Sequence, residues 1–211
     1  MKKRKVIFAI IALVITGAFV FIIKNREYFL EKYEWYKAEG RAEKRYKELM
    51  GKVEKKEKLS SMEIGEVAAY FQLAAKYDEG IRVLEGIKKQ QDDYDVYFSL
   101  SGLHAYKART IRSVDERKEL ALISRDYMME GFRRVPEKPL AYYLRGKAYG
   151  VLGCVEMSVE DFTKAIEESK AVSPVLLGDG LYVDRERFIS MVQRDIDNYK
   201  KFTGDCLLQP V

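Results

Sequence analysis

The stretch that decides the fold covers residues 140–168, LAYYLRGKAYGVLGCVEMSVEDFTKAIEE. Its apolar residues recur every three or four positions on both sides of Gly153, which predicts two amphipathic helices separated by a break. The second helix is expected to begin near Ser158, which precedes Asp161 by three residues in capping-box spacing. The apolar faces comprise Tyr142, Tyr149, Leu152, Val159, Phe162, Ala165 and Ile166.

Small residues stand where these two helices would cross. A large side chain in one helix needs a small residue opposite it if the helices are to interdigitate at the density of a protein core. The sequence supplies Gly146, Gly153, Ser158 and Ala165. The stretch is therefore predicted to form a tight antiparallel helical hairpin that cannot bury its apolar face alone.

This alternation of large and small residues resembles the tetratricopeptide repeat (TPR) family. The family pattern has an aromatic residue, Leu-Gly, a second aromatic residue, a turn glycine, a small residue, a third aromatic residue and an alanine. The matching residues here are Tyr142, Gly146, Tyr149, Gly153, Ser158, Phe162 and Ala165. Two positions depart from the pattern: Arg145 occupies the Leu column, beside Leu144, and Lys170 occupies the closing-proline column.

The pattern recurs toward the N-terminus at about the 34-residue step of the family. Pro136 is the closing proline before this unit, and about ten extra residues, around 113–116, are expected between the two helices of the middle unit. Ile87 is large where a small residue is wanted. The other matching residues are Ile64, Ala68, Phe71, Gly80, Leu84, Phe98, Gly102, Ser124, Met128 and Gly131. The expected repeats are residues 61–94, 95–138 with the insertion, and 139–172, within a repeat domain of residues 60–173.

Composition agrees with an all-α, TPR-like solenoid of helical hairpins. The chain has four prolines, and its 34% of charged residues are mixed in sign with a net charge of +5. A basic block typical of a nucleic-acid-binding protein is missing, so a nucleic-acid partner is not expected. Without its N-terminal segment the chain keeps roughly 185 residues, enough for one domain with a sizeable core.

Residues 1–24 are predicted to be a transmembrane signal-anchor. Four basic residues follow Met1, and an uncharged run of eighteen residues then begins at Val6 and ends at Ile23. At about 1.5 Å per residue this run would span roughly 27 Å, close to the hydrocarbon thickness of a bilayer. A cleaved secretory signal is the alternative, but its apolar region is usually shorter and ends at a small-x-small site.

The basic N-terminus favours a cytoplasmic location for that end of the chain and an extracytoplasmic repeat domain. Residues 25–59 follow as a charged helical stretch in which Gly40 and Gly51 are candidate breaks. Either a stalk or a helix that packs onto the first repeat would fit. The juxtamembrane part of its apolar seam, with Phe29, Tyr33 and Tyr36, could also pair with a second copy. The seam consists of Phe29, Tyr33, Tyr36, Tyr46, Leu49, Met50 and Val53.

Residues 174–211 are predicted to contain a loop, a capping helix and a tail. Pro174 ends the last repeat helix, and residues 178–180, Gly-Asp-Gly, form a turn with apolar flanks. Asp184 is the expected N-cap of a final helix with Phe188, Val192, Ile196 and Tyr199 on one face. A solenoid needs such a terminal cap with a polar outer side.

The sequence proposes no reaction, cofactor or metal. Its one histidine, His104, lies inside a repeat helix without a second histidine or cysteine at metal-ligand spacing, and is interpreted as a structural residue. A Gly-rich phosphate loop is also missing. In an oxidising compartment Cys154 and Cys206 could close a loop of about fifty residues, but two free thiols remain the alternative.

The resemblance implies a concave groove, lined by the first helix of each repeat, that binds an extended peptide or a helix of a partner. The groove columns carry Ala69, Gln72, Leu73, Ser99, Leu103, Tyr106, Lys107, Tyr143, Lys147 and Val151. Family members that grip a carboxylate carry several Lys, Asn and Arg residues at the clamp positions, where this chain has only Lys147 as a base. A mixed apolar and aromatic groove is better suited to a helix or a hydrophobic peptide.

We therefore expect a membrane-anchored interaction scaffold that helps assemble a membrane or envelope complex, without enzymatic activity. The bilayer itself is the second expected partner, through the run from Val6 to Ile23. The alternative function is a periplasmic, chaperone-like binder of exported unfolded chains. One saturable partner would favour the scaffold, and weak binding to many apolar peptides would favour the chaperone.

Overall fold

The structure is a computed structural model that describes residues 26–178, 181–201 and 205–208, with side chains from residue 40 onward. The apolar run from Val6 to Ile23 lies outside these residues. Among those described, no helix combines the length and the apolar character needed to cross a bilayer. The chain divides into two compact units between Lys44 and Arg45.

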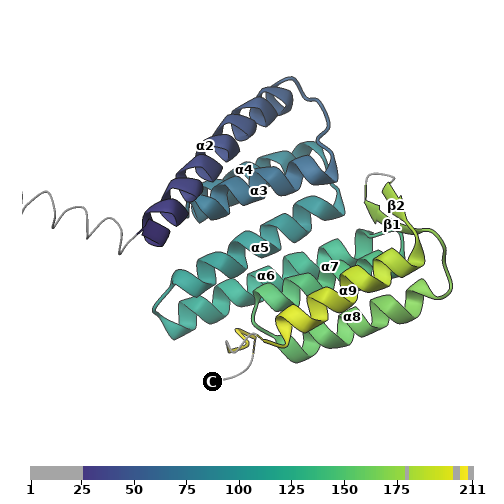
Figure 1. The fold of residues 1–211 in the computed structure, drawn as a ribbon. Helices are drawn as coiled ribbons and strands as arrows, with labels where there is room; N and C mark the ends of the chain where they lie inside the picture. Colours follow the sequence, from purple (N-terminus) through teal and green to yellow (C-terminus); the bar gives the residue numbers. More distant parts are fainter. Residues whose placement is uncertain (1–25, 179–180, 202–204, 209–211) are drawn as a thin grey trace, which may run out of the picture. The chain divides into compact units, whose positions relative to one another are not determined.

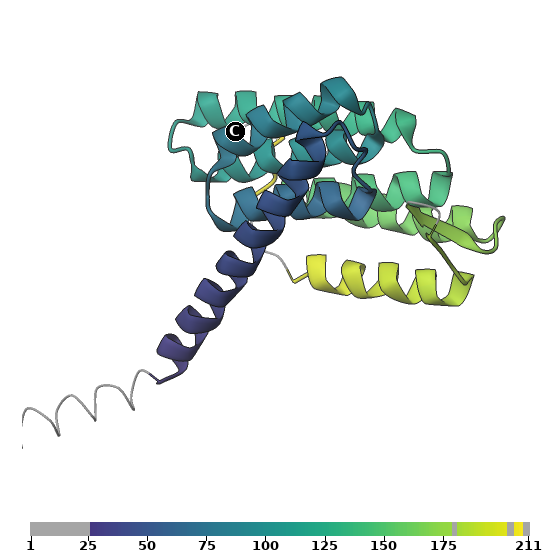
Figure 2. The ribbon, with the colours of Figure 1, turned by 90° about the horizontal axis from the view of Figure 1, so that it is seen from above.

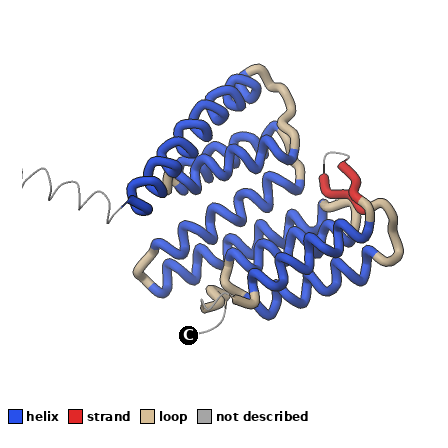
Figure 3. The backbone as a smooth tube through the Cα atoms, in the orientation of Figure 1, coloured by secondary structure: helices blue, strands red, loops and turns tan. Residues whose placement is uncertain are grey.

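Eight helices and one antiparallel β-hairpin make up the described residues (Figures 1 and 3), so the expected all-α class is confirmed. The helices are α2 (Arg26–Glu54), α3 (Ser61–Leu73), α4 (Tyr77–Gln90), α5 (Tyr94–Thr110), α6 (Val114–Arg134), α7 (Lys138–Val151), α8 (Val155–Ser169) and α9 (Arg185–Tyr199). The strands are β1 (Val175–Gly178) and β2 (Leu181–Val183).

Helices α3 to α8 form three consecutive pairs joined by three-residue turns. The first helices of the pairs lie in a row, α3 against α5 and α5 against α7, and α4 also packs against α5 and α6 against α7 (Figures 1 and 2). Each pair thereby buries apolar faces that its two helices alone would leave exposed.

Small residues occupy the helix crossings, as the sequence predicts. A Cβ atom added at Gly146 would lie 2.8 Å from the ring of Phe162, and one added at Gly80 would lie 2.7 Å from Phe71. The Ser158 hydroxyl donates a hydrogen bond of 2.7 Å to the Gly146 carbonyl, which joins α8 to α7. Because these residues are small, the backbone of one helix and an aromatic ring of its partner can pack at the density of a protein core.

The expected start of α8 near Ser158 is wrong: α8 begins at Val155, and Ser158 lies inside it, where its hydroxyl bonds to α7 and does not cap a helix end.

Arg145, which departs from the family pattern, has its own buried partner. Its guanidinium donates two hydrogen bonds to the Asp161 carboxylate, at 2.6 and 2.7 Å. It also lies 4.1 Å from the centre of the Phe132 ring. The Asp161 side chain is only 4% exposed, so the ion pair replaces an apolar contact between α7 and α8 with a charged one.

The last ten residues of α2 pack onto the first pair. Leu49 is fully buried, and the Tyr46 ring stacks on Tyr70 with 4.4 Å between ring centres. Arg45 forms ion pairs with Glu63 and Glu66 of α3. Of the two roles considered for this stretch, residues 45–54 take the packing role, and neither candidate break interrupts the helix.

The extra residues of the middle pair do not form a long loop. Only residues 111–113 separate α5 from α6, and α6 alone is 21 residues long. The Ser113 hydroxyl accepts a hydrogen bond from the Glu116 amide and caps α6. The insertion therefore lengthens the helices, since a capped helix satisfies backbone groups that a loop would leave to water.

The C-terminal helix α9 covers the third pair. Asp184 caps it as expected, and Phe188, Val192 and Ile196 are buried against α7, α8 and the β-hairpin. The hairpin forms where the sequence predicts only a turn with apolar flanks. Its first and last residues, Val175 and Val183, pair with one another and lie in the core.

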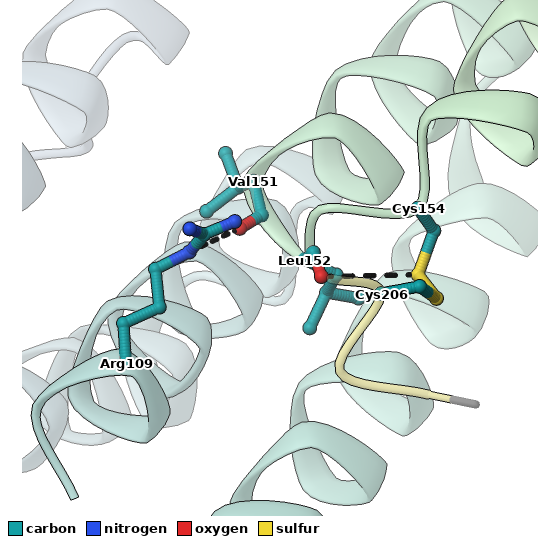
Figure 4. Close-up of a disulfide and its surroundings, with 5 residues drawn as sticks. All are labelled: Arg109, Val151, Leu152, Cys154 and Cys206. Atoms are coloured by element: carbon teal, nitrogen blue, oxygen red, sulfur yellow. Dashed lines mark hydrogen bonds between the residues drawn. A yellow bond between two sulfur atoms is a disulfide. The ribbon is translucent and has the colours of Figure 1, made fainter. Parts of the chain in front are cut away.

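The end of the described chain returns to the turn between α7 and α8 (Figure 4). A disulfide joins Cys154 to Cys206, which resolves the two alternatives for these cysteines. The Leu207 amide donates a hydrogen bond of 3.0 Å to the Leu152 carbonyl. Arg109 of α5 donates one of 2.8 Å to the Val151 carbonyl (Figure 4). Helices α5 and α7 and the tail are thus fixed together at this turn.

The Arg145–Asp161 pair generates a prediction about stability. Either Arg145→Leu or Asp161→Asn should lower the free energy of unfolding by about 3 kcal/mol, because each leaves one buried charged group without its partner. The double variant should lose much less than the sum of the two single losses. Urea unfolding of the purified full-length chain, followed by circular dichroism, measures all four proteins. Additive losses would contradict this account of the pair.

Candidate functional site

A groove of about 430 Å³ runs along the first helices of the three pairs. Helix α3 contributes Ser61, Gly65, Ala68 and Gln72. Helix α5 contributes Asp95, Phe98, Ser99, Gly102 and Tyr106. Helix α7 contributes Leu144, Lys147, Ala148 and Val151, and α9 contributes Tyr199. On α3, α5 and α7 these residues recur at mainly three- or four-residue spacing, so each of the three helices presents one face to the groove.

The middle of the groove is built from residues with small side chains. A Cβ atom added at Gly65 would meet nothing within 4 Å, and one added at Gly102 would meet only the Gln72 amide nitrogen, at 3.6 Å. Because these positions carry no side chain, the backbone or small side chains of a bound segment can approach α3 and α5 closely. The floor is defined here by Gly65, Ala68, Ser99, Gly102 and Ala148.

Tyrosines stand at the far end of the groove. Tyr106 lies eleven residues beyond Asp95 on α5, which places it about 16 Å along the helix from that acidic residue. Tyr199 packs its ring against the backbone of Gly150 on α7. Burial raises the pKa of Tyr199, and the nearby Asp195 and Tyr106 raise it further. The Tyr199 phenol therefore remains a neutral hydrogen-bonding group at physiological pH.

Charge is sparse inside the groove. Asp95 accepts a hydrogen bond from the Ser61 hydroxyl at the N-terminal ends of α5 and α3. Lys147 is exposed, and its ammonium nitrogen lies 5.4 Å from the centre of the Tyr143 ring. These are the two charged residues that line the described groove. Most of its surface is therefore apolar, aromatic or uncharged polar.

Five of the ten groove residues named from the sequence line this groove: Gln72, Ser99, Tyr106, Lys147 and Val151. Ala69 and Leu73 are exposed on α3 but do not line it. The Lys107 ammonium forms an ion pair of 2.7 Å with Asp78 of α4, which draws it toward the second helix of the first pair.

Leu103 and Tyr143 lie in the core, not in the groove where the sequence places them. Leu103 is fully buried next to Gly80 of α4, where an added Cβ would lie 2.8 Å from its methyl group. Tyr143 is 8% exposed, and its hydroxyl donates a hydrogen bond of 2.9 Å to Asp195 of α9. Helices α4 and α9 therefore cover the two positions.

Sequence reasoning missed most of the floor and the wall from α9. Gly65, Ala68 and Gly102 fall on the same helical faces as Gln72, Ser99 and Tyr106, so their spacing alone could have identified them. Tyr199 could not be found in this way, because it belongs to a helix that follows the hairpin and reaches the groove only through tertiary packing.

No group of three or more metal-ligating side chains occurs within the described ranges. His104, the one histidine, is 8% exposed and stacks on the Tyr127 ring at 5.4 Å between ring centres. Neither of its ring nitrogens has a hydrogen-bond partner. Burial lowers the pKa of His104, and Lys107 lowers it further, against smaller opposing effects of Glu85 and Asp78.

Comparison of the chain with models of protein families, with curated proteins and with solved structures gives no match.

The depressed pKa of His104 makes stability depend on pH. The unfolded chain takes up the proton at about pH 6.5, before the folded chain does, so the free energy of unfolding should fall as the pH drops below that value. The slope should not exceed about 1.4 kcal/mol per pH unit. His104→Phe keeps the ring stack and removes the titrating group, so the slope between pH 7 and 5 should become smaller. Equal slopes in urea unfolding of both proteins would exclude His104 as its source.

Proposed function

We propose that this chain is a membrane-anchored scaffold whose TPR-like solenoid binds a protein partner in the groove along α3, α5 and α7. The observation that carries the proposal is the shape of the groove lining. A floor of small residues extends along three parallel helix faces and ends at Tyr106 and Tyr199. Stacked helix pairs with a common open face are the arrangement that solenoid proteins use to bind extended partners.

The length of the groove favours a peptide segment or a helix over a compact small molecule. The distance of about 16 Å from Asp95 to Tyr106 corresponds to about three helical turns. It also corresponds to about five residues of an extended strand. An amphipathic helix could lay its apolar face on the small-residue floor, because the lining has few charged side chains that would need a charged partner.

The membrane location rests on the uncharged run from Val6 to Ile23, which we propose anchors the chain in the bilayer. The basic residues before this run favour a cytoplasmic N-terminus. The Cys154–Cys206 disulfide supports the same orientation, because disulfides persist mainly in oxidising compartments. We therefore place the helix pairs outside the cytoplasm, facing a partner in the membrane or envelope.

A chaperone-like role is the second candidate. Because only Asp95 and Lys147 bring charge to the lining, the groove could accept many apolar segments with little selection by sequence. Titration of the purified full-length chain with unrelated apolar peptides separates the two functions. Weak binding to all of them supports the chaperone, whereas no binding alongside one saturable membrane partner supports the scaffold.

Two matched glycine substitutions test the groove. Gly102→Leu adds a side chain to the groove floor next to Gln72, whereas Gly86→Leu adds the same side chain to α4, where an added Cβ meets nothing within 4 Å. Both replace a helical glycine, so both should stabilise their helix by about 0.5–1 kcal/mol. Only Gly102→Leu should lower the amount of partner recovered with the full-length chain after cross-linking in its own membranes, by about tenfold.

Quantitative mass spectrometry of the cross-linked material gives this ratio, and thermal unfolding of both variants checks that the fold is retained. Equal recovery with the two variants, at equal stability, would show that the partner does not occupy the groove.

A further inference from the structure

The described tail, residues 205–208, is fitted closely to the turn between α7 and α8. Gly153 has a φ angle of +78°, a conformation that favours glycine, and a Cβ atom there would collide with the Asp205 carbonyl. The Leu207 amide bonds to the Leu152 carbonyl in the same turn. The tail therefore passes directly over the turn that separates the two helices of the third pair.

The tail also covers part of the core between the second and third pairs. Cys206, Leu207 and Leu208 pack against a buried cluster that includes Ala105 of α5, Met128 of α6 and Leu152. Ala148, another member of this cluster, belongs to the groove floor. Displacement of the tail would thus expose apolar surface next to the groove.

Helix α7, which precedes the turn covered by the tail, also contacts the end of α9. The Tyr199 ring lies against Gly150, in a space that any side chain at position 150 would fill. Tyr199 is also the one residue by which α9 lines the groove. Tyr199 precedes Asp205 by six positions in the sequence, so the anchor of the groove wall and the anchor of the tail are close together along the chain.

We propose that the Cys154–Cys206 disulfide is a site of thiol–disulfide exchange, opened at Cys206 by a dithiol, and that its opening releases the tail and the Tyr199 wall of the groove. Cys154 is 3% exposed, whereas Cys206 lies in the tail and is partly exposed. Because Cys206 is the more exposed of the two bonded cysteines, we place the attack of an incoming thiolate on its sulfur. The effect on the groove rests on the proposed function, but the exchange itself does not.

The exchange consists of two displacements. One thiolate of the dithiol bonds to the Cys206 sulfur, and the bond to Cys154 breaks so that Cys154 leaves as a thiolate and takes up a proton. The second thiolate of the dithiol then attacks its own sulfur partner in the mixed disulfide and releases Cys206. Two electrons pass from the dithiol to the protein, which gains two thiols, and the dithiol becomes a cyclic disulfide.

Opening the disulfide removes the covalent tether of the tail. Within the described residues its remaining contacts include the Leu207–Leu152 backbone hydrogen bond, the packing of Cys206, Leu207 and Leu208, and the close approach of Asp205 to Gly153. A short segment of exposed and partly exposed residues opens locally at a lower free energy than the whole fold. Reduction should therefore loosen the tail and the end of α9 and leave α3 and α4 unchanged.

Hydrogen exchange of the full-length chain, oxidised and after reduction with dithiothreitol, tests this consequence. We expect exchange at least tenfold faster at the Leu207 amide and at the α9 end, where the Lys200 amide bonds to the Ile196 carbonyl. Peptides from α3 and α4 should exchange at the same rate in both states. Unchanged exchange at the end of α9 would contradict the release of the tail and of Tyr199. Equal acceleration in every helix would show that the disulfide stabilises the whole fold and not this region in particular.

A second measurement tests the point of attack and needs no groove ligand. Partial reaction of the oxidised chain with glutathione, quenched with acid, should give a mixed disulfide mainly at Cys206, in about tenfold excess over Cys154 by mass spectrometry. An excess at Cys154 would overturn the assignment. Leu207→Ala is the matched control in the hydrogen-exchange measurement, because it weakens the packing of the tail but keeps the disulfide. The exchange rate of its oxidised tail should stay within about threefold of that of the unsubstituted chain.

Because neither readout depends on the partner, failure of the exchange site and failure of the groove can be distinguished. A chain that exchanges at Cys206 yet shows no difference between the Gly102→Leu and Gly86→Leu variants would retain the exchange site and lose the groove function. The opposite combination would retain the groove and remove its redox control.

Discussion

The contact of the Phe162 ring with the helix backbone at Gly146 leaves no room for a side chain at that position, and the rest of the fold depends on contacts of this kind. A glycine also meets an aromatic ring at Gly80 with Phe71 and at Gly131 with Phe98. Such crossings bring the helices of each pair close and turn their remaining faces toward the next pair. The common face of α3, α5 and α7 is then left open as a groove. A bulky residue at any of these glycines would separate the helices from which the groove is built.

The groove is completed by elements outside the three pairs. Helix α9 buries Tyr143 and supplies Tyr199, and the disulfide-linked tail fixes the turn after α7 against the second pair. At the other end, residues 45–54 of α2 cover α3 through Leu49 and Tyr46. Both ends of the row of pairs are therefore covered by a helix whose other side is polar. These additions decide which residues of the first helices remain accessible.

Local chemistry explains what could be predicted from the sequence. A capping residue such as Asp184 marks a helix start, and small residues mark crossings, because both effects act within a few residues. The burial of Leu103 and Tyr143 depends on α4 and α9, which lie close to them only in the folded chain. The Arg145–Asp161 pair occupies a position where an apolar residue was expected, since two opposite charges can replace an apolar contact when both partners are present. Helix extension in α5 and α6 and the fit of the tail over Gly153 likewise depend on packing partners that spacing in the sequence does not reveal.

Photo-cross-linking in intact membranes tests directly whether the groove holds a protein partner. A photoreactive residue replaces Ser99 in the groove floor, and a control chain carries it at Glu119, an exposed position on α6. We expect one saturable cross-linked protein from position 99, lost when Gly102→Leu is added, and no such product from position 119. Equal products from both positions, or a product from position 99 that persists with Gly102→Leu, would contradict this expectation.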